Sequence, residues 1–334
     1  QQHGMVLLDA KGDVIRPALL WNDTRSAPQA AAINQAFPDI HIKTGSQLVA
    51  SFTASKVRWV LENEPANAEK IAAIALPHDW LSWKLSGSSD IQELFTDRSD
   101  ASGTGYFDPS TNQYVNEILH WVTGKSDVVL PRIVAPGEVG AKIGKTLIAC
   151  GAGDNAGAAL GIGATVGDLV ISLGTSGTAF AVSSSAAHDK SGEVAGFADA
   201  SGNYLPLACT LNAAKVFDST AKMLGVDFKK FSQLALQANP GSDGLMMLPH
   251  FDGERTPNRP DAEGAILGIT HSNFTPANIA RASIEGVIAG LAYATEALRR
   301  EKVQINRLLL VGGAARNPAV QQIASEIFGM PIHI

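Results

Sequence analysis

Apolar and polar positions are spaced differently along the chain, and from residue 168 onward their spacing predicts strands alternating with helices. Residues 168–182 should form a strand, a glycine turn and a second strand, since short apolar runs flank the sequence Gly-Thr-Ser-Gly. Residues 278–300 carry apolar side chains at helical spacing, so that most of them share one face. Further strands are expected at 204–211 and 307–311, and helices at 213–224, 227–238 and 318–328. This alternation is typical of an α/β fold.

Elements in the first half are predicted to be shorter. The apolar run 5–8 and the pair Val14-Ile15 flank a turn and should form a β-hairpin. A surface loop is expected at 95–107, which is rich in Ser, Asp and Gly. Residues 140–145 have the pattern of the start of a helix, and a predicted strand at 146–150 follows with almost no connecting residues. Helices are expected at 26–36, 55–64, 67–75 and 79–85.

Length and composition agree with two globular domains. The 334 residues are enough for two cores, and 45% hydrophobic with 17% charged residues is ordinary for a globular protein. The spacing of apolar and polar positions changes near Ala164. This change sets the predicted boundary between a first domain at 1–164 and a second domain at 165–334.

Charge and cysteine content narrow the class of protein. A net charge of −6 without a basic stripe argues against nucleic-acid binding. The longest apolar stretch, 146–166, contains Asp154 and Asn155, which argues against a membrane span. Cys150 and Cys209 lie in apolar runs and indicate buried thiols in a reducing compartment. We therefore expect a cytoplasmic protein without a signal peptide.

Two glycine-rich segments carry the clearest chemistry. The segment 151–157 places Asp154 and Asn155 at the start of a small-residue helix, and the segment 171–178 holds two hydroxyls between two glycines in a turn. Such a turn aims several backbone N–H groups at a phosphate. A carboxylate near the mouth of a cleft takes a proton from a sugar hydroxyl. The pair therefore supplies the parts that a sugar kinase needs.

Each of these segments also has a structural interpretation. Asp154 before a run of small residues is good N-cap chemistry, and capping alone is favoured about two to one. The structural alternative for the Gly174–Gly177 turn is an ordinary hairpin turn, so this segment alone is a weak signal, and without Gly-Lys-Ser/Thr it is not a Walker motif. The spacing Gly-x-Gly-x-x-x-Gly from Gly151 also suggests dinucleotide binding, but it departs from the usual fingerprint by one residue, and Asp154 would crowd a pyrophosphate.

Two polar segments near the start are candidates for a polyol pocket. Gln1, Gln2 and His3 precede the first predicted strand, and their amides and imidazole suit sugar hydroxyls. Trp21 and Asp23 could form an aromatic wall with a polar edge, or a buried Trp beside an Asp–Arg pair. Local signals leave both alternatives open.

Two longer patterns resemble the signatures of the FGGY carbohydrate kinases. The first is S-x-T-x-x-K-V-x-W-V-x-E-N at 51–63. The second is G-A-I-L-G-I at 264–269 with N-I-x-x-A-S-I-E at 278–285. Both patterns occur in the family's order, and the resemblance covers the whole chain.

Shorter segments are most similar to the family members that act on D-xylulose. They lie at 1–4, 21–25, 153–155 and 253–257. Glycerol kinases of the family carry Arg-Glu where this chain has Gln2-His3, and Gln in place of Asn155. The resemblance therefore implies ATP-dependent phosphorylation of D-xylulose to D-xylulose 5-phosphate.

The resemblance also implies a fold and a role for each candidate residue. The fold would be two ribonuclease-H-like domains of the actin and hexokinase type around a cleft that closes on substrate. Asp154 would be the general base on the sugar's O5. ATP and Mg²⁺ would be required. The sugar would be held by Gln2, His3 and Asn155, with Trp21 and Asp23 at its pocket; ATP phosphates would be held by Gly174, Thr175, Ser176 and Gly177; and adenosine would contact Gly312, Gly313 and Asn317.

The chain departs from the family pattern at both ends. The family opens with a strand and a phosphate loop, Asp-x-Gly-Thr-x-x-x-Lys, whose Asp would be the main Mg²⁺ contact. Its final Gly- and Ala-rich helix would follow Ile334. Either the protein carries these segments beyond residues 1–334, or the chain is a fragment whose first domain is incomplete. Such a fragment is expected to be inactive and to fold poorly.

Two rival functions remain open from the sequence. One is a kinase for ribulose, gluconate, glycerol or another polyol. The other is a non-catalytic sugar- or nucleotide-binding protein on the same fold. Small molecules are the expected partners in each case, together with a second copy in a homodimer.

Overall fold

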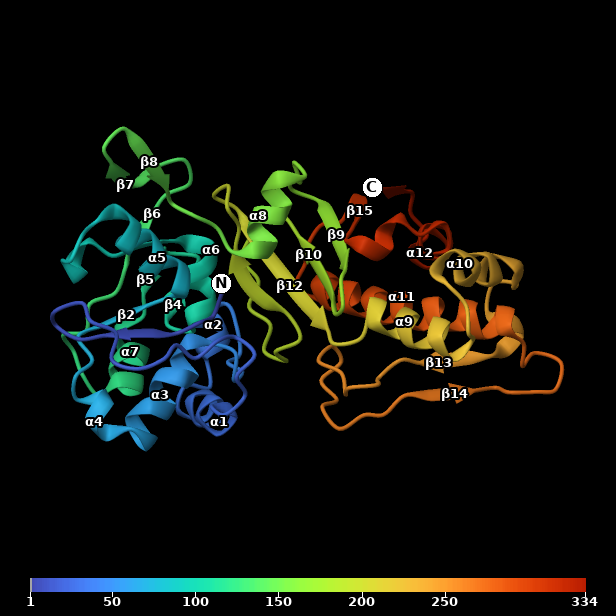
Figure 1. Cartoon of the computed structure of the whole chain (residues 1–334), viewed down its shortest axis with the longest axis horizontal. Helices are drawn as coiled ribbons and strands as arrows, with labels where there is room; N and C mark the ends of the chain where they lie inside the picture. The colour runs from blue at the N-terminus through green and yellow to red at the C-terminus, as the bar shows by residue number, and fades with distance from the viewer. Residues whose placement is uncertain (1) are drawn as a thin grey trace. The chain divides into compact units, whose positions relative to one another are not determined.

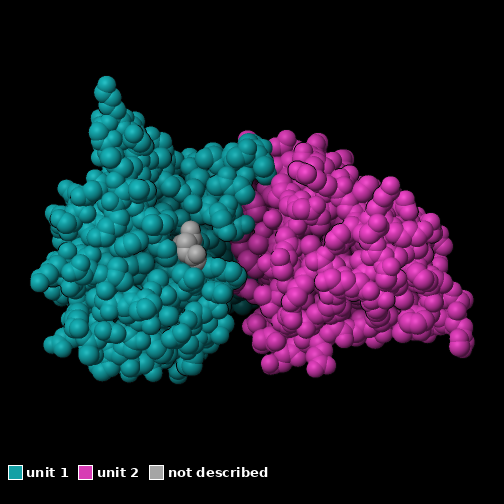
Figure 2. Space-filling view, viewed as in Figure 1, with its two compact units in different colours: residues 1–164, 184–205 teal, residues 165–183, 206–334 magenta. Residues whose placement is uncertain are grey.

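Strands and helices alternate along the chain and are grouped into two units (Figures 1 and 2). The computed structural model describes residues 2–334; Gln1, expected above to act with Gln2 and His3, lies outside the described residues. Unit 1 contains residues 1–164 and 184–205, and unit 2 contains residues 165–183 and 206–334. Within residues 2–334, no helix has the length and apolar character needed to cross a membrane.

Unit 2 is built on a mixed sheet in which strands lie in the order β12-β10-β9-β15-β16. The predicted strand–turn–strand at 168–182 is β9 and β10, paired antiparallel with Leu173 opposite Gly177. β15 runs parallel to β9, with Leu310 opposite Ile171. Most β9 side chains are buried, which explains its nearly continuous apolar sequence. The strands are β9 (Asp168–Leu173), β10 (Gly177–Ala181), β12 (Tyr204–Thr210), β13 (Met246–Leu248), β14 (Ala265–Leu267), β15 (Arg307–Val311) and β16 (Ile332–His333).

The long helix α11 (Pro276–Arg300) organises the helical side of unit 2 (Figure 1). Thr275 caps it by accepting a hydrogen bond from the Asn278 amide at 3.2 Å, and Pro276 occupies its first turn. Its apolar face packs on β10 and β13 and on three helices. Those helices are α9 (Ala214–Met223), α10 (Phe228–Gln237) and α12 (Pro318–Phe328).

Unit 1 combines short strand pairs with helices. The pairs are β1–β2, β3–β6, β4–β5 and β7–β8. The strands are β1 (Val6–Leu8), β2 (Ala73–Ala75), β3 (Phe95–Asp97), β4 (Phe107–Asp108), β5 (Gln113–Tyr114), β6 (Arg132–Val134), β7 (Val139–Ile143), β8 (Thr146–Ala149) and β11 (Ala195–Ala198). The helices are α1 (Ala27–Ala36), α2 (Ile40–Thr44), α3 (Thr53–Asn63), α4 (Pro65–Ala68), α5 (Pro77–Ser86), α6 (Arg98–Ala101), α7 (Asn116–Thr123) and α8 (Asp154–Gly161). Short 3₁₀ segments lie at 91–93, 102–104, 242–244 and 313–316.

Several expectations for unit 1 were wrong. β1 pairs along its length with β2, and the predicted hairpin is confirmed only next to its turn. There an antiparallel bridge joins Leu8 to Val14, and the amides of Asp9 and Ile15 donate to the carbonyl oxygens of Asp13 and Leu7. Residues 67–75 contain the end of α4 and then β2, because the apolar run there is buried as a strand. The segment 140–149 is most of the β7–β8 hairpin, which turns at Gly144 with a φ of +57°.

The segment 95–107 is the largest departure, since it is buried rather than a surface loop. It forms β3, α6, a 3₁₀ turn and β4. Asp97 caps α6 by accepting hydrogen bonds from two backbone amides, so its polar residues satisfy their own backbone inside the protein. Cys150 and Cys209, expected to be buried, are half-buried and form no disulfide within residues 2–334.

Candidate functional site

Asp154 is the first residue of α8, and the preceding Gly153 occupies the N-cap position. The capping role considered for Asp154 is therefore wrong: the N-cap residue is a glycine, and α8 has no side-chain capping hydrogen bond. The Asp154 side chain is exposed, and its Oδ1 accepts hydrogen bonds from the backbone and side-chain nitrogens of Asn155 at 2.8 and 3.1 Å. An acidic residue in the first helical turn is stabilised by the helix dipole. The result is an accessible carboxylate with a fixed amide neighbour.

Gln2 and His3 lie on the same part of unit 1 as the loop that leads into α8. Gln2 Nε2 donates to the Ser99 carbonyl oxygen at 3.2 Å, and a Cβ on Gly153 would lie 3.2 Å from Gln2 Nε2. His3 has a φ of +63°, and its Nδ1 lies 2.8 Å from the Gly103 carbonyl oxygen. Gln2, Asp154 and Asn155 thus belong to neighbouring segments.

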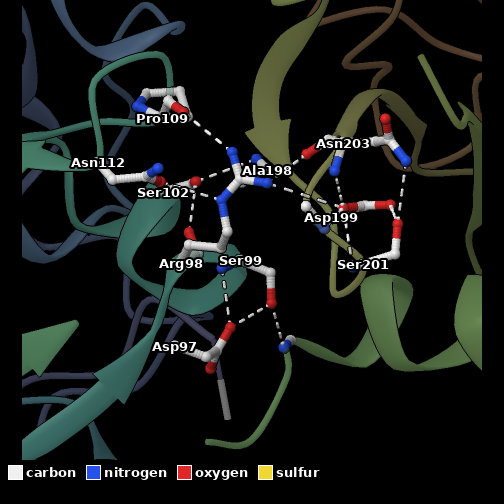
Figure 3. A network of polar contacts seen from close by, with 12 residues as sticks. Asp97, Arg98, Ser99, Ser102, Pro109, Asn112, Ala198, Asp199, Ser201 and Asn203 are labelled. Atoms are coloured by element: carbon white, nitrogen blue, oxygen red, sulfur yellow. Dashed lines mark hydrogen bonds and ion pairs between the residues drawn. The ribbon is translucent and has the colours of Figure 1, made fainter. Parts of the chain in front are cut away.

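The α6 turn (residues 97–102) supports this arrangement (Figure 3). Asp97 Oδ1 accepts hydrogen bonds from the amides of Ser99 and Asp100 and from the Ser99 hydroxyl. Ser99 Oγ in turn accepts a hydrogen bond from the Gly153 amide at 2.9 Å. The residue before Asp154 is therefore anchored directly to the α6 turn.

Arg98 fixes the other side of the α6 turn (Figure 3). Its side chain is buried, and its guanidinium donates to oxygen atoms of Pro109, Asn112 and Asn203. Asp199 lies 3.8 Å away and balances the charge. A buried cation needs such a complete set of partners.

Sequence reasoning missed these supporting residues, together with His78 and Asp79 of α5. His78 Nε2 lies 2.9 Å from Asp79 Oδ1 and 3.4 Å from Asp97 Oδ2, and His78 Nδ1 lies 3.4 Å from Asp100 Oδ2. Ligand atoms of His78, Asp97 and Asp100 lie within 4.8 Å of one another. The Ser- and Asp-rich composition of 95–107 suggested a surface loop, although the same polar residues also suit a buried network.

For Trp21 and Asp23, the alternative of a buried Trp is wrong, whereas the Asp–Arg pair is present; their place at a sugar pocket stays a prediction. Trp21 is 58% exposed. Both carboxylate oxygens of Asp23 accept from Arg25 Nε, at 2.9 and 3.0 Å. This hydrogen bond holds the pKa of Asp23 below its usual value. Asp23 therefore takes part in the Asp–Arg pair that was the structural alternative.

In unit 2, the Gly174–Gly177 turn joins β9 to β10. Gly174, Thr175 and Ser176 are exposed, whereas Gly177 is buried as the first residue of β10. A Cβ on Gly177 would lie 2.6 Å from Thr210 Oγ1, so a larger residue there would force the Thr210 side chain to shift. The exposed part of the turn leaves hydroxyls and backbone available to a ligand.

A cavity of about 470 Å³ opens beside this turn, wholly within unit 2. Its volume is in the range of small-molecule sites. Four of the predicted nucleotide-binding residues line it, namely Gly174, Thr175, Gly313 and Asn317, together with Leu173, Ala214, Phe217, Asp218, Phe228 and Ala314.

Asn317, which lines the cavity, and Gly312, which precedes the lining residue Gly313, also have structural roles. Asn317 caps α12, its Oδ1 accepting from the amides of Ala319 and Val320 and from Ser232 Oγ. Gly312 has a φ of +97°, and a Cβ there would lie 2.5 Å from the Leu173 carbonyl oxygen. Glycine at 312 therefore lets the β15 end approach β9 closely.

Comparisons with known proteins cover both halves of the chain. The N-terminal domain of the FGGY family of carbohydrate kinases matches residues 1–167, and the C-terminal domain of that family matches residues 169–334. The xylulose kinases of Streptomyces coelicolor and Streptomyces rubiginosus are 44% and 42% identical to the chain, over 100% of it and 69% of each relative.

A solved structure agrees with these sequence matches. The crystal structure of xylulose kinase from Bifidobacterium adolescentis matches with a TM-score of 0.91 and 43% identity, over 99% of this chain and 75% of the other. The fold expected from the resemblance, two domains of the actin and hexokinase type, is confirmed. The chain belongs to the FGGY family of carbohydrate kinases.

Proposed function

We propose that the chain catalyses ATP-dependent phosphorylation of D-xylulose at O5, giving D-xylulose 5-phosphate and ADP. The relatives with 42–44% identity over the whole chain are xylulose kinases, which supports this substrate. The observation that carries the chemistry is the exposed carboxylate of Asp154, fixed at the start of α8 by Asn155. Such a group is suited to accept a proton from an alcohol.

In the proposed reaction, Asp154 removes the proton from the O5 hydroxyl as that oxygen attacks the γ-phosphorus of ATP. Gln2, His3 and Asn155 hold the other sugar hydroxyls through their amides and imidazole. The bond between the γ-phosphorus and the bridging oxygen breaks, and ADP leaves with that oxygen. Positioning and charge stabilisation dominate phosphoryl transfer, so the anchored start of α8 matters as much as the base itself.

The cavity of unit 2 is proposed as the ATP site. Its mixed lining suits a nucleotide, because Phe217 and Phe228 offer apolar surface to a base while the Gly174–Ser176 turn offers N–H and hydroxyl groups to phosphates. Mg²⁺ fits a site with exposed oxygen donors such as Thr175 and Ser176, and when bound it would neutralise phosphate charge.

Replacing the proposed base tests the mechanism. Asp154→Asn keeps the shape of the side chain and its acceptor oxygen, so the fold should persist while kcat falls about 10²-fold or more. The matched control is Asp127→Asn, at an exposed loop residue of the same unit, which should leave kcat unchanged. Turnover of Asp154→Asn near the wild-type level would exclude Asp154 as the base.

A sugar panel tests the substrate. In a coupled assay with Mg-ATP, D-xylulose should give a higher kcat/KM than ribulose, gluconate or glycerol. A higher kcat/KM for any of the others would reassign the substrate while leaving the kinase chemistry in place.

A further inference from the structure

Four ionisable side chains, His78, Asp79, Asp97 and Asp100, meet inside unit 1 and are called the His78 cluster. The three carboxylates are buried, whereas the His78 side chain is 20% exposed. The imidazole faces carboxylates through both nitrogens, with Nε2 toward Asp79 and Asp97 and Nδ1 toward Asp100. The cluster joins α5 to the α6 turn.

The carboxylates of the His78 cluster are only partly satisfied by the backbone. Asp79 Oδ2 accepts a hydrogen bond from the Leu76 amide, and Asp97 Oδ1 accepts the two amide hydrogen bonds that cap α6. Within residues 2–334, Asp79 Oδ1, Asp97 Oδ2 and both oxygens of Asp100 have no hydrogen-bond partner. Buried carboxylates in this state need a positive charge nearby, and the imidazole ring is the group that faces them.

The ionisation of the cluster agrees with this geometry. Burial alone would lower the pKa of His78, but the neighbouring Asp79, Asp97 and Asp100 outweigh it and raise the pKa to about 11. Burial raises the pKa of the Asp100 carboxyl to about 7. The three carboxylates therefore favour the protonated imidazole, and both ring nitrogens lie near carboxylate oxygens without forming a hydrogen bond to them.

The loop that leads to Asp154 lies directly on this cluster. A Cβ on Gly151 would be 3.5 Å from both Asp97 Oδ2 and His78 Cδ2. Gly153 donates its amide to Ser99 Oγ, and a Cβ on it would be 3.3 Å from Asp100 Oδ1. Gln2 reaches the same turn through the Ser99 carbonyl. One turn thus carries both the approach to the proposed base and a proposed sugar contact.

We propose that His78 is a positioning residue, whose imidazolium holds the α6 turn in place and, through Ser99, fixes the start of α8 and the Gln2 side chain. The proposal rests on the proposed function for its effect on catalysis, but its effect on local order does not. The alternative source of this charge is a metal ion at His78, Asp97 and Asp100. The imidazole in contact with Asp79 at 2.9 Å already supplies it.

The test uses His78→Gln, which removes the charge, and His78→Lys, which restores a cation. His78→Gln should lower kcat for D-xylulose about 10- to 100-fold and raise its KM, since small displacements of a catalytic group have effects of this size. The KM for ATP should not change, because the cavity of unit 2 is untouched. His78→Lys should recover kcat to within about 3-fold. The matched control, His120→Gln on α7, changes an exposed histidine of the same unit and should behave as wild type.

Hydrogen exchange of residues 151–157 separates this proposal from the proposed function. Exchange there should accelerate in His78→Gln and return toward wild type in His78→Lys, whatever sugar the protein uses. If His78→Gln does not fold, Ser99→Ala removes the link to Gly153, and with it the hydroxyl hydrogen bond to Asp97, while it keeps all four side chains of the cluster. It should show the same acceleration and loss of kcat. Wild-type exchange and kcat in the folded variants would overturn the proposal. So would one equivalent of a divalent metal in the purified protein that is lost in His78→Gln.

Discussion

Gly312 and its neighbour Gly313, which lines the unit 2 cavity, differ sharply in the space they leave for a side chain. Gly312 has a φ of +97°, and an added Cβ would meet the carbonyl oxygen, carbonyl carbon and amide nitrogen of Leu173 at 2.5–3.0 Å. Around Gly313 an added Cβ would meet nothing within 4 Å. Close packing against β9 therefore requires glycine at position 312, whereas at position 313 there is room for a side chain.

Gly312→Ala should destabilise unit 2 by about 1–3 kcal/mol, because the obstructing atoms belong to a buried strand backbone that cannot move away. It should also weaken ATP binding, since Gly312 precedes two residues that line the cavity. Urea unfolding and calorimetric titration with ATP measure the two effects.

Gly313→Ala is the matched control, and its unfolding free energy should lie within about 0.5 kcal/mol of wild type. Equal stability of the two variants would contradict the close approach of Gly312 to β9.

At the scale of elements, β9 and β15 are held by an ion pair at their shared end. Arg307 Nε and Nη2 donate to Asp168 Oδ1 and Oδ2 at 2.8 and 2.6 Å, and Thr165 donates its amide to the same carboxylate at 2.7 Å. The hydrogen bonds from Arg307, together with those from Thr165, hold the pKa of Asp168 below its usual value despite burial.

Asp168→Asn should lower the unfolding free energy by about 2 kcal/mol at pH 7, the scale of charge-assisted hydrogen bonds. Because the folded pKa lies below the unfolded one, this stabilisation is present above the unfolded pKa, near 3.8, and is lost as pH falls through the folded pKa. The wild type and the variant should therefore converge below about pH 4. Urea unfolding across this pH range measures the difference.

Asp252→Asn is the control for Asp168→Asn. Asp252 pairs with Lys215 at 2.7 Å, but both side chains are more than half exposed. Exposed pairs contribute little, so its effect should stay below about 1 kcal/mol at every pH. A pH-independent loss in Asp168→Asn would show that its carboxylate charge is not the cause.

Sequence patterns predicted the elements of unit 2 closely and those of unit 1 less well. β9, α11 and α12 were found within a few residues of their expected bounds, because long apolar periods and clear caps specify them. The short strands of unit 1 carry two to five residues each, too few for a period to be recognised. The buried segment 95–107 was missed because its polar residues are satisfied by partners distant in sequence, such as Asn203 for Arg98.

Among candidate site residues, those defined by local backbone were the easiest to find. The Gly174–Gly177 turn and Asp154 are marked by glycines around a chemical group. Gly174, Thr175, Gly313 and Asn317 do line one cavity, although their ligand contacts stay a prediction. His78 and Ser99 carry no such local mark, because their roles depend on which segments the fold brings together.

At the scale of the whole molecule, the proposed nucleotide and sugar residues belong to different units. ATP alone at 100 times its Kd should stabilise the protein by about 2.7 kcal/mol through mass action. Its protection against hydrogen exchange should centre on 173–175 and 313–317 of unit 2. D-xylulose alone should instead protect residues 2–3 and 151–157. Hydrogen exchange with each ligand separately makes the measurement, and protection of only the opposite unit would contradict the assignment.

Residues 184–205 belong to unit 1, although they lie in the sequence between two stretches of unit 2. The polypeptide therefore passes between the units three times, at 164/165, 183/184 and 205/206. A protease that nicks the single bond after Ala164 would therefore free neither unit whole. The shorter product would lack the Asn203 carbonyl and the Asp199 carboxylate that satisfy Arg98, and the longer product would still carry residues 184–205 of unit 1. A gene that encodes either unit alone would have to join two separate stretches of the sequence.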